Sequence, residues 1–214
     1  MKIGKYKGLN AKEIPVSVTE EDVERVLANE QRMNSVIVQK EGQRIRILQK
    51  LDDDFAKDFS EYDTLKAWKE AIYEELFNQR FDDAEAELSQ ELLKQVLADS
   101  DIPVDSEIRD YLYEELYEDL IAHISSIHLD LDGFAQKTGR TAQQVLEELK
   151  EEADFSVRSQ MALHEIARLE GITVSPDEVS EYLEGDEDEE EAEAIADELL
   201  MEAALAFIRE HAVL

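Results

Sequence analysis

The sequence predicts a mostly α-helical protein, and three observations lead to that prediction. Only 7 Gly and 3 Pro occur among 214 residues, too few for the many turns of an all-β chain. Apolar residues recur at helical spacing over long segments that begin with N-cap residues. The longest segment runs from Thr64 to about Leu97 without Gly or Pro, which implies a helix roughly 50 Å long.

The N-terminal part is predicted to form one helix and one small β-hairpin. Thr19 with Asp22 has the spacing of a capping box and starts a helix that extends to about Met33. Two short runs rich in β-branched residues follow, 35–39 and 44–48, around a Gly-containing turn. They predict two antiparallel strands ahead of the long helix.

Five helices are predicted after the long one, most of them from their capping residues. Asp105 is a suitable N-cap, Thr141 with Gln144 makes a capping box, and Gly171 supplies a C-terminal stop. Ser175 caps a helix with proline in its first turn. The predicted ranges are 105–128, 132–136, 141–170, 175–183, and a last helix that starts within 187–193 and ends near His211.

The composition is typical of a soluble cytoplasmic protein. Apolar residues make up 43% of the chain, which suffices for a core, and no Cys is present to form a disulfide or a thiolate metal site. The start of the chain lacks an apolar signal region, and no run approaches the ~20 apolar residues of a membrane span. We therefore expect a cytoplasmic protein with no membrane partner.

Charge is distributed unevenly along the chain. Residues 1–50 contain 10 Lys or Arg and 7 Asp or Glu, a balance of +3, whereas residues 51–214 contain 12 and 47, a balance of −35. The acidic part would repel phosphate backbones, so we expect no nucleic-acid partner, and basic proteins are attractive partners. The alternative is that the charge only keeps a protein with exposed apolar patches soluble.

Three segments stand out by their order and spacing along the chain. They are Asp52-Asp53-Asp54-Phe55-Ala56 ahead of Tyr62-Asp63-Thr64-Leu65, then Ile102-Pro103-Val104, then Thr138-Gly139-Arg140-Thr141 before a long helix that ends at Glu170-Gly171. Together they resemble the helical C-terminal domain of bacterial trigger factor, a chaperone of nascent chains. The resemblance implies an elongated multi-helix domain with projecting arms.

The N-terminal residues resemble the strap of the same family, at Tyr6-Lys7-Gly8-Leu9 and at 18–23. We therefore expect two parts: a strap with helix and hairpin over 1–50, and a helical body over 51–214. The family's ribosome-docking loop is absent, and residues 34–50 stand where its prolyl isomerase domain would lie. On this resemblance we expect neither ribosome docking nor prolyl isomerase activity.

The predicted helix 105–128 has an apolar face too wide for one packing partner. Its apolar side chains cover an arc of about 180°, whereas packing on one side needs a stripe of about 100°. Part of the arc is predicted to contact an unfolded polypeptide, here called a client; the alternative is that two neighbouring helices cover it. The predicted client-binding residues are Tyr111, Tyr113, Leu116, Tyr117, Leu120, Ile121 and Ile124.

The aromatic residues of the preceding long helix are predicted to be core. Trp68, Phe77 and Phe81 fall on a drifting apolar stripe, which is typical of a buried helix face. The other members of the stripe are Ile72, Leu76 and Leu88.

No pattern indicates catalytic, metal or cofactor chemistry. The four histidines are scattered and none has the H-E-x-x-H spacing of a zinc helix. Asp130-x-Asp132-Gly133 lacks the remaining ligands of a calcium loop, and Asp52–Asp54 is interpreted as flanking a helix. The acidic run 185–191 is interpreted as a solvated loop and a first helical turn. We expect no cofactor, no metal and no enzyme.

The resemblance, together with the wide apolar arc of the helix 105–128, implies an ATP-independent chaperone, a holdase, that binds unfolded or nascent polypeptides through apolar patches in a helical cradle. Two alternatives remain open. One is an assembly or adaptor protein for a single dedicated basic partner. The other is a prolyl isomerase, which the resemblance disfavours because the family's isomerase residues lie in a domain that this chain lacks. A homodimer is also left open.

Overall fold

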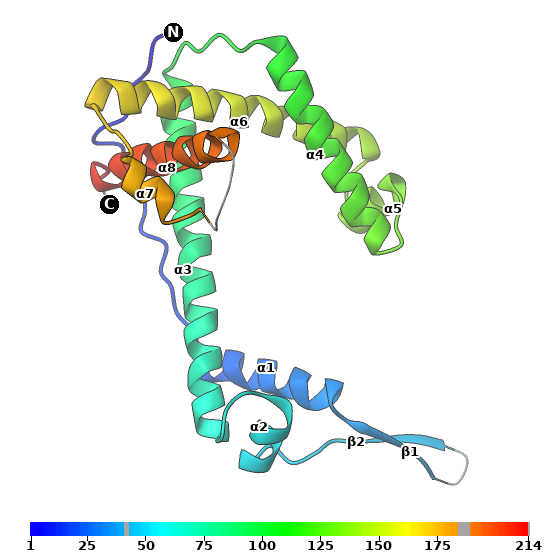
Figure 1. Ribbon diagram of the computed structural model, residues 1–214. Coiled ribbons are helices and arrows are strands. Elements are labelled where there is room, and N and C mark those ends of the chain that lie inside the picture. The colour runs from blue at the N-terminus through cyan, green and yellow to red at the C-terminus, as the bar shows by residue number, and fades with distance from the viewer. Residues whose placement is uncertain (41–42, 184–188, 214) are drawn as a thin grey trace. The chain divides into compact units, whose positions relative to one another are not determined.

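The mostly helical prediction is confirmed by the computed structural model, which describes residues 1–40, 43–183 and 189–213 (Figure 1). The described residues form helices and one two-stranded antiparallel sheet. In chain order they are α1 Glu20–Met33, β1 Val36–Lys40, β2 Gln43–Ile47, α2 Asp53–Phe59, α3 Leu65–Ala98, α4 Ser106–Ser126, α5 Leu131–Lys137, α6 Ala142–Glu170, α7 Pro176–Ser180 and α8 Glu189–Glu210.

Capping residues set most helix boundaries, as predicted. Thr19 and Thr141 close capping boxes at the starts of α1 and α6, and the side chain of Asp105 accepts a hydrogen bond from the Glu107 amide at the start of α4. Gly171 ends α6 in the left-handed region at φ 68°, a conformation that glycine adopts without steric cost. Helix α7 ends at Ser180, three residues before the predicted end.

Helix α2 was not predicted. It has only seven residues, too few for a helical period to show in the sequence. Its N-cap is Asp52, whose side chain accepts a hydrogen bond from the Phe55 amide at 3.2 Å. The interpretation as helix-flanking is therefore confirmed for Asp52 and wrong for Asp53 and Asp54, which form the first turn of the short helix that was missed.

The chain divides into two compact units. Unit 1 consists of residues 1–12 and 89–214, and unit 2 consists of residues 13–88. Helix α3 contributes its C-terminal end to unit 1 and the rest to unit 2. The predicted division after residue 50 follows the modules of the resembled family, and it stays a prediction.

The core of unit 2 is built from α1, α2 and α3. Its most buried aromatic side chain is Phe55, which lies 4.7 Å from Phe59 and 5.9 Å from Trp68, measured between ring centroids. Trp68 and Ile72 were predicted to be core, and both are buried. The other buried members of the cluster are Val23, Leu27 and Ala56.

An ion pair joins α1 to α3 within unit 2. The Arg80 guanidinium donates to the Asp22 carboxylate at 3.0 Å and also to the Ser17 carbonyl. Asp22 is at the same time the capping-box acid of α1, because it accepts from the Thr19 amide at 3.0 Å. These hydrogen bonds, the one from Arg80 foremost, hold the pKa of Asp22 well below its usual range.

We expect the variant Asp22→Asn to lose stability in a pH-dependent way. A depressed carboxyl pKa contributes stability that is fully present above the ordinary value of 3.8 and is lost as the pH falls from there through the folded-state pKa. Urea unfolding of the two proteins at pH 7 and at successively lower pH should therefore show a difference in unfolding free energy that shrinks below about pH 4. A difference that stays constant down to the lowest pH would contradict this account.

The N-terminal segment 1–12 is hydrogen-bonded along unit 1. The Lys2 and Asp101 backbones form a β-bridge, with N–O distances of 2.9 and 2.8 Å, and the Gly8 amide donates to the His211 carbonyl at 2.7 Å. The side chains of Tyr6 and Lys7 both donate to the Glu170 carboxylate, at 2.6 and 2.8 Å. The pKa of Glu170 is lowered by these two hydrogen bonds, the one from Lys7 first.

We expect Gly4→Ala to loosen this segment. A Cβ atom at Gly4 would lie 2.7 Å from Cβ and 2.8 Å from the carbonyl carbon of Asp99, so the backbone must shift. The shift would break the 2.8 Å hydrogen bond from the Gly4 amide to Ser100 Oγ. Thermal unfolding should show a loss of about 1–3 kcal/mol. The control Lys2→Ala leaves the backbone bridge intact, and an equal loss in both variants would contradict this explanation.

Candidate functional site

The predicted client-binding face of α4 is only partly covered. Helix α4 packs against α5 and α6, so the proposed alternative of two covering neighbours accounts for much of the wide arc. Ile124 is 1% exposed and is a core residue, so its assignment to the client-binding face was wrong. Tyr111 and Tyr117 are exposed, together with Ile108, which was not predicted. Half-buried positions are Tyr113, Leu116, Leu120 and Ile121.

A cavity of about 720 Å³ lies between the C-terminal end of α3, the start of α4 and the middle of α6, all in unit 1. We call it the cationic pocket. Two aromatic side chains, Tyr113 and Phe155, line it, and the Lys150 ammonium lies 5.5 Å from the centroid of the Tyr113 ring. The basic side chains that line it are Lys94, Arg109, Lys150 and Arg158. One predicted client-binding residue, Tyr113, therefore belongs to a real cavity.

An exposed row of aromatic rings lies on α3 in unit 2. Tyr73, Phe77 and Phe81 stack at ring-centroid distances of 6.4 and 6.5 Å, and their exposed fractions are 44, 37 and 46%. We call this row the aromatic ladder. The prediction that Phe77 and Phe81 are core was wrong. At its start, Tyr73 also lines a shallow pocket of about 440 Å³ with Val23 of α1.

The wrong assignment of Phe77 and Phe81 to the core has a geometric cause that can be recognised in the sequence. The core row is Trp68, Ile72 and Leu76, whereas the ladder is offset from it by one residue, or about 100° around the helix. Treating both rows as one drifting stripe merged a buried face with an exposed one. Two rows at i, i+4 spacing side by side are the signal that would have separated them.

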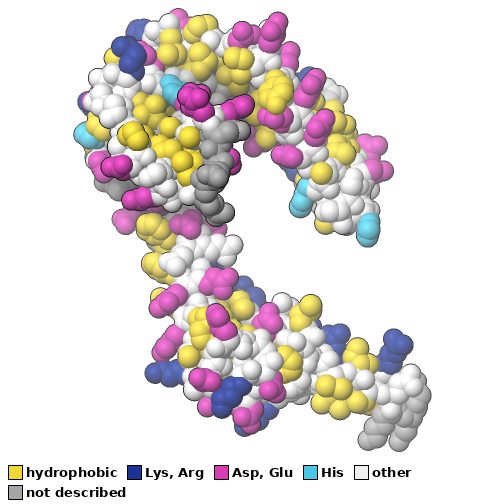
Figure 2. Space-filling model, viewed as in Figure 1, with side chains coloured by type: hydrophobic (Ala, Val, Ile, Leu, Met, Phe, Trp, Pro, Cys, Tyr) yellow, Lys and Arg dark blue, Asp and Glu magenta, His cyan; other side chains and the backbone are white. Residues whose placement is uncertain are grey.

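The hairpin β1–β2 exposes a second apolar surface in unit 2. Its register pairs Val36 with Ile47 and Val38 with Ile45, which places these four side chains on one face. The opposite face carries Ile37 and two arginines, Arg44 and Arg46. Figure 2 shows hydrophobic side chains beside basic ones on this hairpin. Such a two-stranded sheet is marginally stable unless something covers its apolar face.

The sequence of this chain matches the model of a known protein family over most of its length. The family model described as bacterial trigger factor protein (TF) C-terminus matches residues 64–212, which include α3 to α8. The chain belongs to the trigger factor family.

Individual trigger factors match the chain over most of its length. The trigger factor of Acetivibrio thermocellus is 31% identical over 181 residues, 80% of this chain and 40% of the relative. That of Halothermothrix orenii is 30% identical over 141 residues, 66% of this chain and 33% of the relative. The chain thus spans about a third to two fifths of the length of these trigger factors.

Among solved structures, a chain from work on promiscuous substrate recognition in folding and assembly activities of the trigger factor chaperone is similar to this one. The superposition covers 92% of this chain and 70% of the solved chain, with a TM-score of 0.45 and 14% sequence identity. The family assignment rests on the sequence matches and not on this one.

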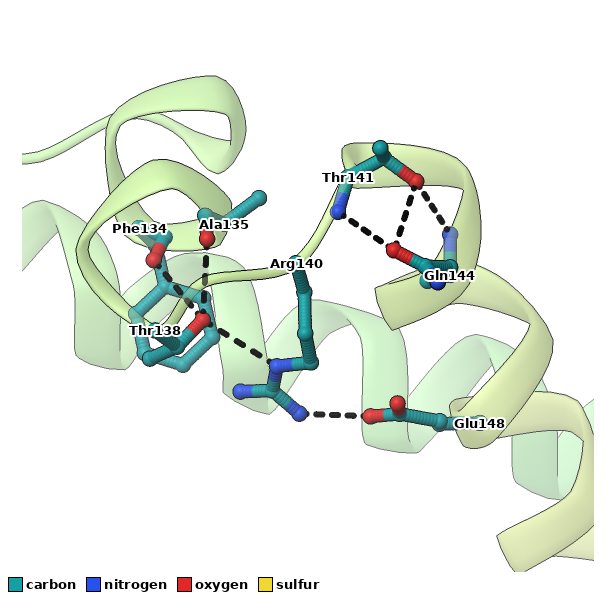
Figure 3. Close-up of polar contacts among 7 residues, drawn as sticks. All are labelled: Phe134, Ala135, Thr138, Arg140, Thr141, Gln144 and Glu148. Carbon is teal, nitrogen blue, oxygen red and sulfur yellow. Dashed lines mark hydrogen bonds and ion pairs between the residues drawn. The ribbon is translucent and has the colours of Figure 1, made fainter.

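The trigger factor motif Thr138-Gly139-Arg140-Thr141 forms the corner between α5 and α6 (Figure 3). The Arg140 guanidinium donates to Thr138 Oγ1 at 3.1 Å and to the Glu148 carboxylate, and it lies 5.5 Å from the centroid of the Phe134 ring. Gly139 turns the chain at φ 71°. Because α5 packs on α4, this corner supports the end of the helix that carries the tyrosines. These contacts of Arg140 stabilise the corner.

Over residues 1–40, 43–183 and 189–213, no group of three His, Asp or Glu side chains is arranged to bind a metal ion. The acidic run 185–191 is described only from Glu189, where it forms the first turn of α8 as predicted. Every helix in the described part of the chain falls short of the length or the apolarity that crossing a bilayer requires.

Proposed function

We propose that this chain is an ATP-independent holdase, which binds unfolded or newly made polypeptides reversibly through exposed apolar surfaces. The observation that carries the proposal is the aromatic ladder, because three stacked rings exposed on one helix are unusual unless a partner covers them. Membership of the trigger factor family supports it. The exposed tyrosines of α4 and the apolar face of the hairpin provide further contact surfaces.

Several weak contacts suit a holdase better than one tight site. Covering a large apolar side chain contributes roughly 1.5–3 kcal/mol before the entropy lost on association is subtracted. A single patch would therefore bind weakly and release quickly. Patches on separate elements that engage one client chain act together, since each further contact is intramolecular. Affinity then depends on the length and apolar content of the client.

The net charge of −32 supports the same function. A complex between a holdase and an unfolded chain exposes apolar surface and tends to associate further. Strong like charge on every holdase molecule opposes that association. Basic clients gain an additional attraction, which should weaken as salt is added.

The test is aggregation of a chemically denatured model protein, followed by light scattering in nucleotide-free buffer. We expect the chain to suppress scattering in proportion to its molar ratio, and added ATP to change nothing. Serum albumin at equal mass controls for crowding. No suppression at a several-fold molar excess would refute the proposal.

The acidic charge also permits the second candidate, an adaptor for one dedicated basic partner. Affinity capture from a native lysate separates the two candidates. A holdase should retain many proteins at low stoichiometry, whereas an adaptor should retain one at near-equal amounts. Analytical ultracentrifugation of the purified chain gives its molar mass and so decides whether it is a homodimer. We propose no catalysis.

A further inference from the structure

The cationic pocket has a charge balance opposite to that of its surroundings. Residues 89–214 contain 8 Lys or Arg and 34 Asp or Glu. Four of those eight basic side chains line this pocket, against three acidic ones. Because acidic residues are four times as common in this part of the chain, a patch chosen at random would carry mostly carboxylates. The pocket is therefore enriched in basic side chains relative to the rest of residues 89–214.

Two of the four cations have structural partners. Arg158 donates to the Leu97 carbonyl at 3.0 Å, near the end of α3, and lies 3.9 Å from the carboxylate of Asp154. Arg109 pairs with its neighbour Asp110 at 2.9 Å. These two guanidinium groups therefore already have partners within the protein.

The two lysines differ from the arginines. Among the residues that the structure describes, no carboxylate oxygen lies within 4.0 Å of Lys94 Nζ or Lys150 Nζ. Lys94 donates instead to the amide oxygen of Gln90 at 3.2 Å, and Lys150 lies over the ring of Tyr113. Both lysines are exposed at the pocket, so an incoming anion can reach them.

The aromatic rings that line the same pocket indicate which ligand would fit it. Phe155 is half-buried in the pocket wall, and with Tyr113 it offers apolar surface within a cavity large enough for one or two side chains. A ligand that matches both features has a large apolar side chain beside a carboxylate. In an unfolded polypeptide this is an aromatic or aliphatic residue next to Asp or Glu.

We infer that the cationic pocket selects client segments in which a large apolar residue adjoins an acidic one. The inference rests on the proposed holdase function and specifies what one of its contact sites recognises. It runs against the charge of the whole chain, which favours basic clients. Long-range repulsion would slow the approach of an acidic segment, whereas contacts within the pocket would slow its departure.

The test uses three short peptides with blocked ends and the same Phe-Leu centre, flanked by two Asp, two Asn or two Lys residues. Binding is measured by isothermal titration calorimetry at low salt. We expect the Asp peptide to bind about fivefold to tenfold more tightly than the Asn peptide, and the Lys peptide to bind most weakly. The preference should decline at 0.5 M salt, because exposed charges are screened.

Variants test whether Lys94 and Lys150 cause the preference for the Asp peptide. Lys94→Gln combined with Lys150→Gln should remove the preference for Asp over Asn. The control Lys57→Gln with Lys137→Gln removes the same charge from exposed sites outside the pocket and should keep the preference. Replacing Lys94 and Lys150 by Arg should also keep it.

Equal binding of the Asp and Asn peptides to the unaltered chain would overturn the inference, and so would binding of neither. Loss of the preference in the Lys57 and Lys137 control would also overturn it, since net charge would then be the cause. The holdase proposal is judged separately by light scattering. Suppressed aggregation without a peptide preference would leave a holdase with no acidic selectivity at this pocket.

Discussion

Phe55→Ala should destabilise unit 2 by about 3–5 kcal/mol, the range observed when a buried phenylalanine is truncated in a core. Phe55 is 2% exposed and its ring contacts those of Phe59 and Trp68. It comes from α2, whereas Trp68 belongs to α3, so truncation leaves a cavity between two helices. A helix of seven residues has little stability of its own, and α2 depends on this contact.

Trp68 makes the measurement specific. It is the only tryptophan of the chain and lies in unit 2, so its fluorescence follows that unit. With a slope of about 1.5 kcal/mol per molar urea, a loss of 3 kcal/mol lowers the fluorescence midpoint by about 2 M. The matched control is Phe81→Ala, which removes the same side chain from an exposed site and should cost less than about 1 kcal/mol. Similar losses in both variants would contradict the burial assigned to Phe55.

Local signals in the sequence were sufficient for most of the secondary structure. Thr19, Asp105 and Thr141 mark helix starts because an N-cap acts on amides two or three residues away, and such contacts are readable from spacing alone. The hairpin was predicted to within one residue at each end because its signal, two runs of β-branched residues around a turn, is also local in the sequence. Helix α2 was missed because its stability comes from tertiary packing of Phe55, which spacing does not reveal.

The candidate sites were less accessible to sequence analysis. Whether an apolar face is covered depends on where neighbouring helices lie. Ile124 turned out buried and Phe81 exposed although both fall on apolar rows. The cationic pocket joins Lys94 to Lys150, which are far apart in sequence. No periodicity brings them together, and only the packing of α4 on α6 beside the end of α3 does so.

Removing the aromatic ladder should have the largest effect on holdase activity. Tyr73→Ser, Phe77→Ser and Phe81→Ser together delete three exposed rings while leaving the core row of α3 in place. We take each ring to contribute roughly 1 kcal/mol to client binding. The remaining surfaces on α4 and the hairpin still bind the client and so offset part of this loss. We therefore expect at least a fivefold rise in the amount of chain needed for half-maximal suppression of aggregation.

A polar variant of the same helix is the matched control. Glu75→Ser, Asn78→Ser and Asp82→Ser change three exposed positions beside the ladder and impose a similar helix-propensity cost. Circular dichroism and Trp68 fluorescence should show both variants folded. If the ladder variant unfolds and the control does not, the rings are part of the core, which would contradict their exposure in the structure.

The most direct test is light scattering of one denatured model protein with the unaltered chain, the ladder variant and the polar control at matched concentrations. The ladder variant should need at least fivefold more protein for half-maximal suppression, whereas the polar control should match the unaltered chain. Equal suppression by all three proteins would contradict the claim that exposed aromatic side chains of α3 bind unfolded polypeptides.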